Sequence, residues 1–281
     1  MPRGMSVEHT IAFVGAGNMA GALIRGLIGT GTVPADRIIA ADPDQARLSS
    51  LEAELEIGVT SDNAEAVKDA TVIVLATKPQ VFGQVLPGLA VAIGPDALLI
   101  SIAAGISTGM IERAFPARSR VVRTMPNTPA LVGAGATAIA AGSHATDDDL
   151  ALAETLFRSV GISVRVPEEQ IDAVTGLSGS GPAYVFAMIE ALRDAGVREG
   201  LPEETALRLA SQTVFGAARL LLDENEAPEI LRDRVTSPGG TTRAGLDALA
   251  DAGFADAILG AVRAATRRSV ELGKIAEGAL D

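Results

Sequence analysis

The sequence predicts an α/β fold: a doubly wound, mainly parallel β-sheet in the first part of the chain, followed by an all-α domain. Short β-branched runs alternate with helix-sized segments up to about residue 166, which is typical of a parallel sheet. Beyond Pro167 these runs stop, and long segments rich in Ala and Leu follow. A chain of 281 residues also favours two domains over one, and we expect them at residues 1–166 and 167–281.

Five apolar runs predict the strands of the sheet. They are TIAFVGAG (10–17), RIIAAD (37–42), ATVIVLAT (70–77), ALLISIAAG (97–105) and RVVRTM (120–125). Four later segments predict helices, at 181–196, 202–224, 242–252 and 254–279. The first two of these helices are apolar on more than one face, more than one small helical domain can cover. We therefore expect an oligomer, in which a partner buries the excess.

Composition and charge exclude several classes of function. The formal net charge is −12, and the sequence has no Lys/Arg cluster that would neutralise phosphates, so we expect no nucleic-acid partner. The sequence contains no cysteine, which excludes disulfides and thiol catalysis. Its two histidines, His9 and His144, have no second ligand at metal spacing, so we expect no metal site.

The sequence predicts neither a membrane span nor a signal peptide. Its most apolar long stretch, residues 88–106, contains Pro95 and Asp96 in the middle, which is typical of a helix end, a turn and a buried strand. No apolar stretch of the signal type follows the N-terminal MPRGMSVEHT. We expect a cytoplasmic protein that starts at Met1 or Met5.

The segment VGAGNMAGAL carries a G-x-G-x-x-A turn directly after a predicted strand and at the start of a predicted helix. Gly15 permits the tight turn, Gly17 lets the backbone approach a pyrophosphate, and Ala20 allows close helix packing. This context predicts a Rossmann-like dinucleotide-binding domain. The residues expected at the cofactor are Val14, Gly15, Ala16, Gly17, Asn18, Met19 and Ala20.

Asp42 ends the second predicted strand, where a carboxylate would accept hydrogen bonds from a ribose 2′-OH and repel a 2′-phosphate. This position favours NADH over NADPH. The alternative is a turn aspartate that precedes Pro43.

The segment ATKP follows another strand at the carboxyl edge of the sheet, where doubly wound folds bind their ligands. Lys78 is either a contact to the cofactor or substrate or an ordinary surface lysine. The residues of this segment are Ala76, Thr77, Lys78 and Pro79.

Three longer motifs resemble those of the pyrroline-5-carboxylate reductase family. They are MPNTPA (125–130), DAVTGLSGSGPAY (172–184) and SPGGTT (237–242). The resemblance implies reduction of the ring C=N of 1-pyrroline-5-carboxylate by NADPH or NADH, giving L-proline in the last step of proline biosynthesis. A protonated imine is already electrophilic, so catalysis by positioning would explain the absence of a catalytic cysteine or histidine.

The resemblance also implies roles for individual residues. The hydroxyl of Thr242 would lie against the ring nitrogen, orient the imine and relay a proton, while backbone N–H groups at the start of the 242–252 helix would hold the substrate carboxylate. The alternative is a Ser-Pro-Gly-Gly turn with a threonine helix cap. The other residues implied at the substrate are Glu168, Ser237, Gly239, Gly240 and Thr241. For Glu168 the alternative to a substrate contact is that its charge complements a helix dipole.

Further implications of the resemblance concern the cofactor and the assembly. The family builds dimers by interleaving its C-terminal helices, with the substrate pocket close to the dimer interface, and often assembles larger rings, such as a decamer of five dimers. Three more residues match family positions that line the dinucleotide, namely Asn63, Lys78 and Ala104.

Two alternative functions remain at this stage. One is a β-hydroxyacid dehydrogenase, whose second-domain motif resembles GLSGSGPAYV, but Val185 and Ile189 stand where that motif carries its catalytic lysine and asparagine. The other is a regulator that senses NAD(P)H without turnover. Such a sensor would have no reason to retain the whole set of second-domain motifs.

Overall fold

The structure is a computed structural model that describes residues 9–280, so the expected starts at Met1 and Met5 lie outside the described residues. The chain divides into two compact units. One holds the chain up to Ser180 together with the residues from Ala264 on, and the other is Gly181–Arg263.

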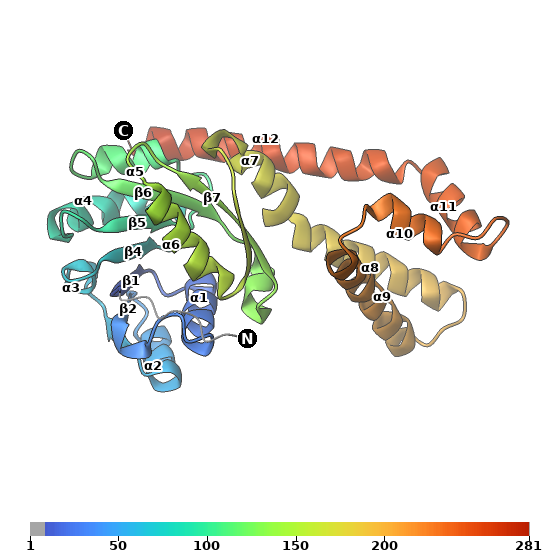
Figure 1. The fold of residues 1–281 in the computed structure, drawn as a ribbon, viewed down its shortest axis with the longest axis horizontal. Coiled ribbons are helices and arrows are strands. Elements are labelled where there is room, and N and C mark those ends of the chain that lie inside the picture. Colours follow the sequence, from blue (N-terminus) through green and yellow to red (C-terminus); the bar gives the residue numbers. More distant parts are fainter. Residues whose placement is uncertain (1–8, 281) are drawn as a thin grey trace. The chain divides into compact units, whose positions relative to one another are not determined.

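The first unit is built on an eight-stranded sheet in the order β3-β2-β1-β4-β5-β6-β7-β8 (Figure 1). Strands β1 to β6 run parallel, β7 is antiparallel to β6, and β8 is parallel to β7. The mainly parallel, doubly wound sheet is therefore confirmed. The strands are β1 (Ile11–Val14), β2 (Ile38–Ala41), β3 (Gly58–Thr60), β4 (Val72–Leu75), β5 (Leu98–Ser101), β6 (Arg120–Met125), β7 (Gly135–Ala141) and β8 (Gly161–Arg165).

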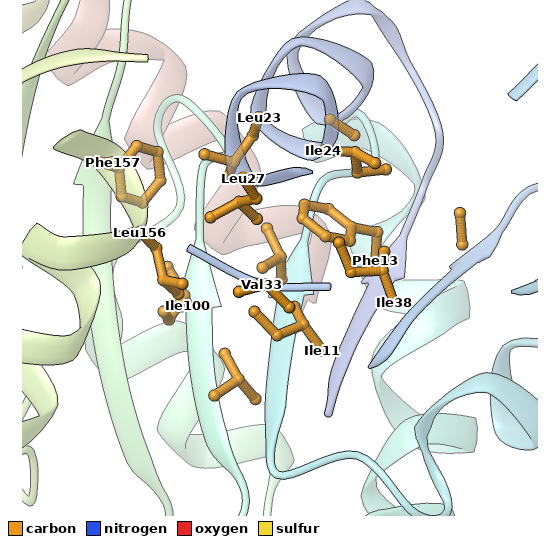
Figure 2. Packing of buried hydrophobic residues seen from close by; sticks show 14 of the residues in the cluster. Ile11, Phe13, Leu23, Ile24, Leu27, Val33, Ile38, Ile100, Leu156 and Phe157 are labelled. Atoms are coloured by element: carbon orange, nitrogen blue, oxygen red, sulfur yellow. The ribbon is translucent and has the colours of Figure 1, made fainter. Parts of the chain in front are cut away.

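Helices cover both faces of the sheet. Alternate residues of β1 show the two layers, because Ile11 and Phe13 pack with α1, α2 and α6, whereas Ala12 and Val14 pack with α4 and α5. Figure 2 shows the first of these clusters, with Phe13 beside the α1 side chains. The helices of this unit are α1 (Asn18–Gly29), α2 (Gln45–Leu55), α3 (Asn63–Val67), α4 (Phe82–Ala92), α5 (Thr108–Ala114), α6 (Asp147–Arg158) and α7 (Ile171–Val174).

The second unit is helical, as the sequence predicts. Its helices are α8 (Gly181–Arg198), α9 (Glu203–Glu224), α10 (Pro228–Arg234), α11 (Thr241–Asp251) and the first part of α12 (Phe254–Leu280). The last part of α12 belongs to the first unit, where the Ser269 hydroxyl donates to Asp172 at 2.6 Å and Arg113 pairs with Glu277. Among residues 9–280, none of the helices combines the length and the apolar character that a membrane span requires.

The helical unit leaves much apolar surface open. Of its hydrophobic side chains, Ala206 and Ala210 are buried, whereas Phe186 is 67% exposed and Leu222 is 74% exposed. Monomeric proteins rarely expose so many large apolar side chains together. The excess apolar surface expected for α8 and α9 is therefore present in the isolated chain.

The start of β8 yields a prediction about stability. Gly161 has φ +152°, and a Cβ there would overlap the backbone of Gly135 in the adjacent strand. We expect Gly161→Ala to lower the free energy of unfolding by roughly 2–4 kcal/mol, because the two strands must separate. Gly31→Ala is the control: Gly31 has φ +70° with open space around it, and should lose only about 1–2 kcal/mol. Urea unfolding of both variants measures the difference, and equal losses would contradict the overlap.

Candidate active site

The glycine turn after β1 lies where the ends of three strands converge. Gly15 has φ +98° and donates its N–H to Ala41 O, at the end of β2, at 2.8 Å. A Cβ on Gly15 would lie 2.8 Å from the carbonyl of Ala76, directly after β4. Only glycine fits this approach, and it brings the turn and the ATKP segment together.

Helix α1 starts at this turn without a side-chain cap. Gly17 occupies the N-cap position, and its carbonyl accepts from Gly21 N–H at 2.9 Å. The N–H groups of the first turn are thus left for a ligand, as expected for a pyrophosphate site. A hollow of about 300 Å³ opens beside them, lined by Ala16, Gly17, Asn18, Gly21, Arg25, Asp44, Arg47, Ser50 and Leu51.

Asp42 holds this turn in place. Its carboxylate accepts from Ala16 N–H at 2.8 Å and from Asp44 N–H at 3.0 Å. The turn-aspartate interpretation therefore describes at least part of what Asp42 does. The guanidinium of Arg47 lies 3.8 Å from the same carboxylate and lines the hollow. Sequence reasoning missed Arg47, although its place in the first turn of the helix after β2 is a signal for a phosphate contact.

The other expected cofactor residues fall into two places. Lys78 and Ala104 are exposed and follow β4 and β5, whose last residues, Leu75 and Ser101, are paired. Asn63 begins α3 and lines a separate hollow of about 380 Å³. The structure thus brings the loops after β1, β3, β4 and β5 to one edge of the sheet, with Asn63 at a hollow separate from that beside the glycine turn.

Two of the quoted motifs contact each other. Asn127, in MPNTPA, is buried, and its Nδ2 donates to Ser178 O at 3.1 Å while its Oδ1 accepts from Ala136 N–H at 2.8 Å. Ser178 lies in GLSGSGP, within a π-helical turn over Thr175–Gly179. Such turns occur often at functional sites. Sequence patterns predicted no role for Asn127, and the structure shows that its side chain holds this turn.

Glu168 lies in the first unit and is held by three donors. It accepts from the Thr108 N–H at 2.7 Å, from the Thr108 hydroxyl at 2.5 Å and from Arg123 at 3.2 Å. Sequence reasoning missed Thr108 and Arg123. The signal for Arg123 was present, as a charged residue inside the apolar strand RVVRTM.

The SPGGTT segment lies in the second unit as a turn that leads into α11. Gly240 N–H donates to Ser237 O at 3.0 Å, and Gly240 is the N-cap of a helix that begins at Thr241. No side chain caps α11 in the described chain, so the expected alternative of a threonine cap is wrong. Thr242 is exposed in the first helical turn, where the N–H groups lack helical partners. These features fit an anion cradle with a hydroxyl beside it.

Comparison with known proteins identifies the family. A curated pyrroline-5-carboxylate reductase from Synechocystis is 49% identical over 270 residues, covering 96% of this chain and all of the relative, and one from Methanosarcina acetivorans is 47% identical over 95% and 99%. This chain belongs to the pyrroline-5-carboxylate reductase family. Its residues 168–272 match the model described as pyrroline-5-carboxylate reductase dimerisation, and residues 10–105 match NADP oxidoreductase, coenzyme F420-dependent.

Solved structures of the family share the whole fold. The pyrroline-5-carboxylate reductase of Coxiella burnetii has a TM-score of 0.91 at 39% identity, covering 95% of this chain and 99% of that one. The Plasmodium falciparum pyrroline carboxylate reductase, solved with NADP bound, has a TM-score of 0.84 at 31% identity, covering 96% and 100%. The reductase family thus includes an NADP-bound member, and its dimerisation region covers the helices whose apolar side chains are exposed here, which supports a homodimer.

Proposed function

We propose that this chain reduces the C=N bond of 1-pyrroline-5-carboxylate to give L-proline, the last step of proline biosynthesis. The observation that carries the proposal is the full-length match to pyrroline-5-carboxylate reductases, at up to 49% identity among the relatives compared. The uncapped start of α11 in SPGGTT supports it, because it offers donors to a carboxylate next to a free hydroxyl.

The glycine turn fits a dinucleotide. Small residues line its approach, the start of α1 has free N–H groups, and the hollow beside it carries Arg47. The bound nicotinamide supplies the hydride. We propose that this chain uses NADH at least as well as NADPH, because the Asp42 carboxylate, 3.8 Å from the Arg47 guanidinium, repels a 2′-phosphate, while the positive charge of Arg47 keeps NADPH acceptable.

The substrate is held by its carboxylate and its ring nitrogen. The Gly239 N–H and the first-turn N–H groups of α11 bind the carboxylate, and the Gly240 N–H, which donates to Ser237 O, holds the turn that also contains Thr241. The Thr242 hydroxyl lies against the ring nitrogen and orients the imine. When hydride adds to the ring carbon the nitrogen gains a lone pair, and the hydroxyl then relays a proton to the product amine. Positioning of this kind supplies most of the rate where the electrophile is already activated.

The larger organisation is also part of the proposal. Residues 1–166 bind the dinucleotide, and residues 167–281 bind substrate and dimerise. The match to the dimerisation model starts at residue 168, which supports a functional boundary near residue 167. The compact units of the structure divide later, at Ser180. We further propose a cytoplasmic enzyme whose substrate pocket lies close to the dimer interface, with a decamer of five dimers as its larger assembly.

A reduction assay tests the function. The purified chain should oxidise NADH or NADPH only when 1-pyrroline-5-carboxylate is present, with loss of absorbance at 340 nm and formation of proline in equal amounts. Saturable binding of NAD(P)H without any turnover would instead favour the dinucleotide-sensing regulator. Turnover of a β-hydroxyacid but not of the imino acid would favour the dehydrogenase.

A substitution of Asp42 tests the proposed cofactor preference. We expect Asp42→Ser to raise the ratio of kcat/KM for NADPH to that for NADH by about 10-fold, because a like charge near the 2′-phosphate is removed. The ratio is the readout, since Asp42 also holds the N–H groups of Ala16 and Asp44. The matched variant Arg47→Ala should move the ratio the other way. An unmodified enzyme that prefers NADPH by about ten-fold or more would show that the role given to Asp42 is wrong.

Substitutions of Thr242 test its proposed role at the ring nitrogen. We expect Thr242→Ala to lower kcat by about 10- to 1,000-fold, the range between losing one aligned hydrogen bond and losing a proton relay. NADH affinity should hardly change, because the glycine turn lies in the other unit. Thr242→Ser retains the hydroxyl and should recover much of the rate. Stopped-flow kinetics measure the rate of hydride transfer in both variants, and NADH titration measures their affinity for the cofactor. Near-normal turnover of the alanine variant would show that the proton comes from solvent and not through Thr242.

A further inference from the structure

Arg123 is a charged residue in the interior of the sheet. It lies on β6 between β5 and β7, paired in register with Ser101 on one side and Ala140 on the other. Its side chain is 7% exposed. Burying a guanidinium costs several kcal/mol unless a counter-charge compensates it. A residue at this position in a central strand would ordinarily be apolar, so the burial of the Arg123 charge needs an explanation.

The counter-charge of Arg123 is Glu168. The two side chains are 3.2 Å apart, and the Nε of Arg123 is buried with no hydrogen-bond partner among residues 9–280. No other ion pair of Arg123 is found in this part of the chain. The burial of Arg123 is therefore compensated by one carboxylate, which is itself 27% exposed.

Arg123 and Thr108 together fix the orientation of Glu168. Oε1 accepts from Thr108 N–H and from Arg123, and Oε2 accepts from the Thr108 hydroxyl. A carboxylate has about four acceptor positions, so these three bonds leave about one, on Oε2. Because the Glu168 side chain is partly exposed, a donor from outside the protein can approach this carboxylate.

The group lies at the ligand-binding end of the sheet. Arg123 is level with Ser101, the last residue of β5, which in turn is level with Leu75, the last residue of β4. Thr108 begins α5, after the loop that carries Ala104. Three segments far apart in sequence thus meet where the chain leaves β4 and β5, the edge at which doubly wound folds bind their ligands.

We infer that Arg123 is a positioning residue for the reduction: with Thr108 it fixes the Glu168 carboxylate so that Oε2 accepts the N–H of the substrate ring. The inference rests on the proposed function and on the expectation from the family resemblance that Glu168 lies at the substrate. A protonated imine carries a positive charge and a single N–H donor, and both match one free acceptor position on a carboxylate. Arg123 itself does not touch the substrate and acts through Glu168.

A double-mutant cycle tests the inference. Arg123→Met removes the charge and keeps an apolar side chain of similar length, and we expect kcat/KM for the imino acid to fall about 10- to 100-fold, since a misplacement of 1 Å can cost that much. NADH affinity should stay unchanged. In Arg123→Met/Glu168→Gln the loss should be no larger than in Glu168→Gln alone, because Arg123 acts through Glu168. Losses that multiply would overturn the inference.

A second pair of variants covers the case in which Glu168→Gln fails to fold, since that change leaves Arg123 buried and unpaired. Thr108→Val removes one donor to Glu168 and keeps both charges. It should lower kcat/KM in the same direction as Arg123→Met, and the two changes together should lose less than the product of the single losses. Arg123→Lys should recover part of the rate. Wild-type kcat/KM in Arg123→Met would overturn the inference.

Arg120 supplies the control for a purely structural role. It lies on the same strand and pairs at 2.7 Å with Asp149, a carboxylate that is 4% exposed. Arg120→Met should lower the unfolding midpoint and leave the KM for the imino acid unchanged, and Arg123→Met would behave likewise if its role were structural alone. A wild-type chain that reduces no imino acid would overturn the proposed function and this inference together. An active wild type with multiplying losses overturns the inference alone.

Discussion

The close approach of Gly15 to the end of β4 is the constraint on which the dinucleotide site depends. The turn is held by two hydrogen bonds, from Gly15 N–H to Ala41 O and from Ala16 N–H to the Asp42 carboxylate. Any side chain at Gly15 would push the turn off the Ala76 carbonyl, 2.8 Å from where its Cβ would lie. The direction of α1, and so of its free N–H groups, follows from the position of this turn.

The two helices that face the proposed ligands, α1 and α11, share one feature. Glycine is the N-cap of both, and no side chain bonds their first N–H groups within residues 9–280. Helices α2 and α6, in contrast, are capped by Asp44 and Thr146. A side-chain cap stabilises a helix by about 1 kcal/mol. Helices α4, α9 and α10 also begin without a side-chain cap in the described part of the chain, so the glycine N-cap, which lets an anion approach the backbone N–H groups, is what α1 and α11 share.

Much of the fold could be predicted from the sequence, because β1, β2, β4, β5 and β6 are runs of large or β-branched apolar residues. Strand β7 escaped prediction since GATAIAA is made mostly of small residues, and β3 is only three residues long. The glycine turn and the position of SPGGTT before a helix were also readable, because both depend on local spacing. A local sequence pattern does not show which distant residue a polar side chain will contact once the chain has folded.

Asp42, Asn127 and Glu168 show that limit. Asp42 ends a predicted strand, Asn127 lies in a motif and Glu168 matches a family position, yet their hydrogen bonds reach residues 2 to 60 positions away. The cap of α11 is a smaller case. Moving the start of the helix by one residue, from 242 to Thr241, places Gly240 at the cap and turns Thr242 from a terminal residue into one of the first turn.

The charge of the chain explains why anions are met by backbone groups. With a net charge of −12, this protein repels acidic ligands at a distance, and many of its arginines are already paired with carboxylates, such as Arg25 with Glu54 and Arg165 with Glu154. Backbone N–H groups at a helix start carry partial charge without adding a cation, and their effect falls off within one turn. Binding of an anionic cofactor and an anionic substrate therefore depends on contact geometry, which glycine turns fix, rather than on long-range attraction. Arg123 follows the same pattern, because its charge is buried and paired with Glu168, which it orients, and so does not attract anions at a distance.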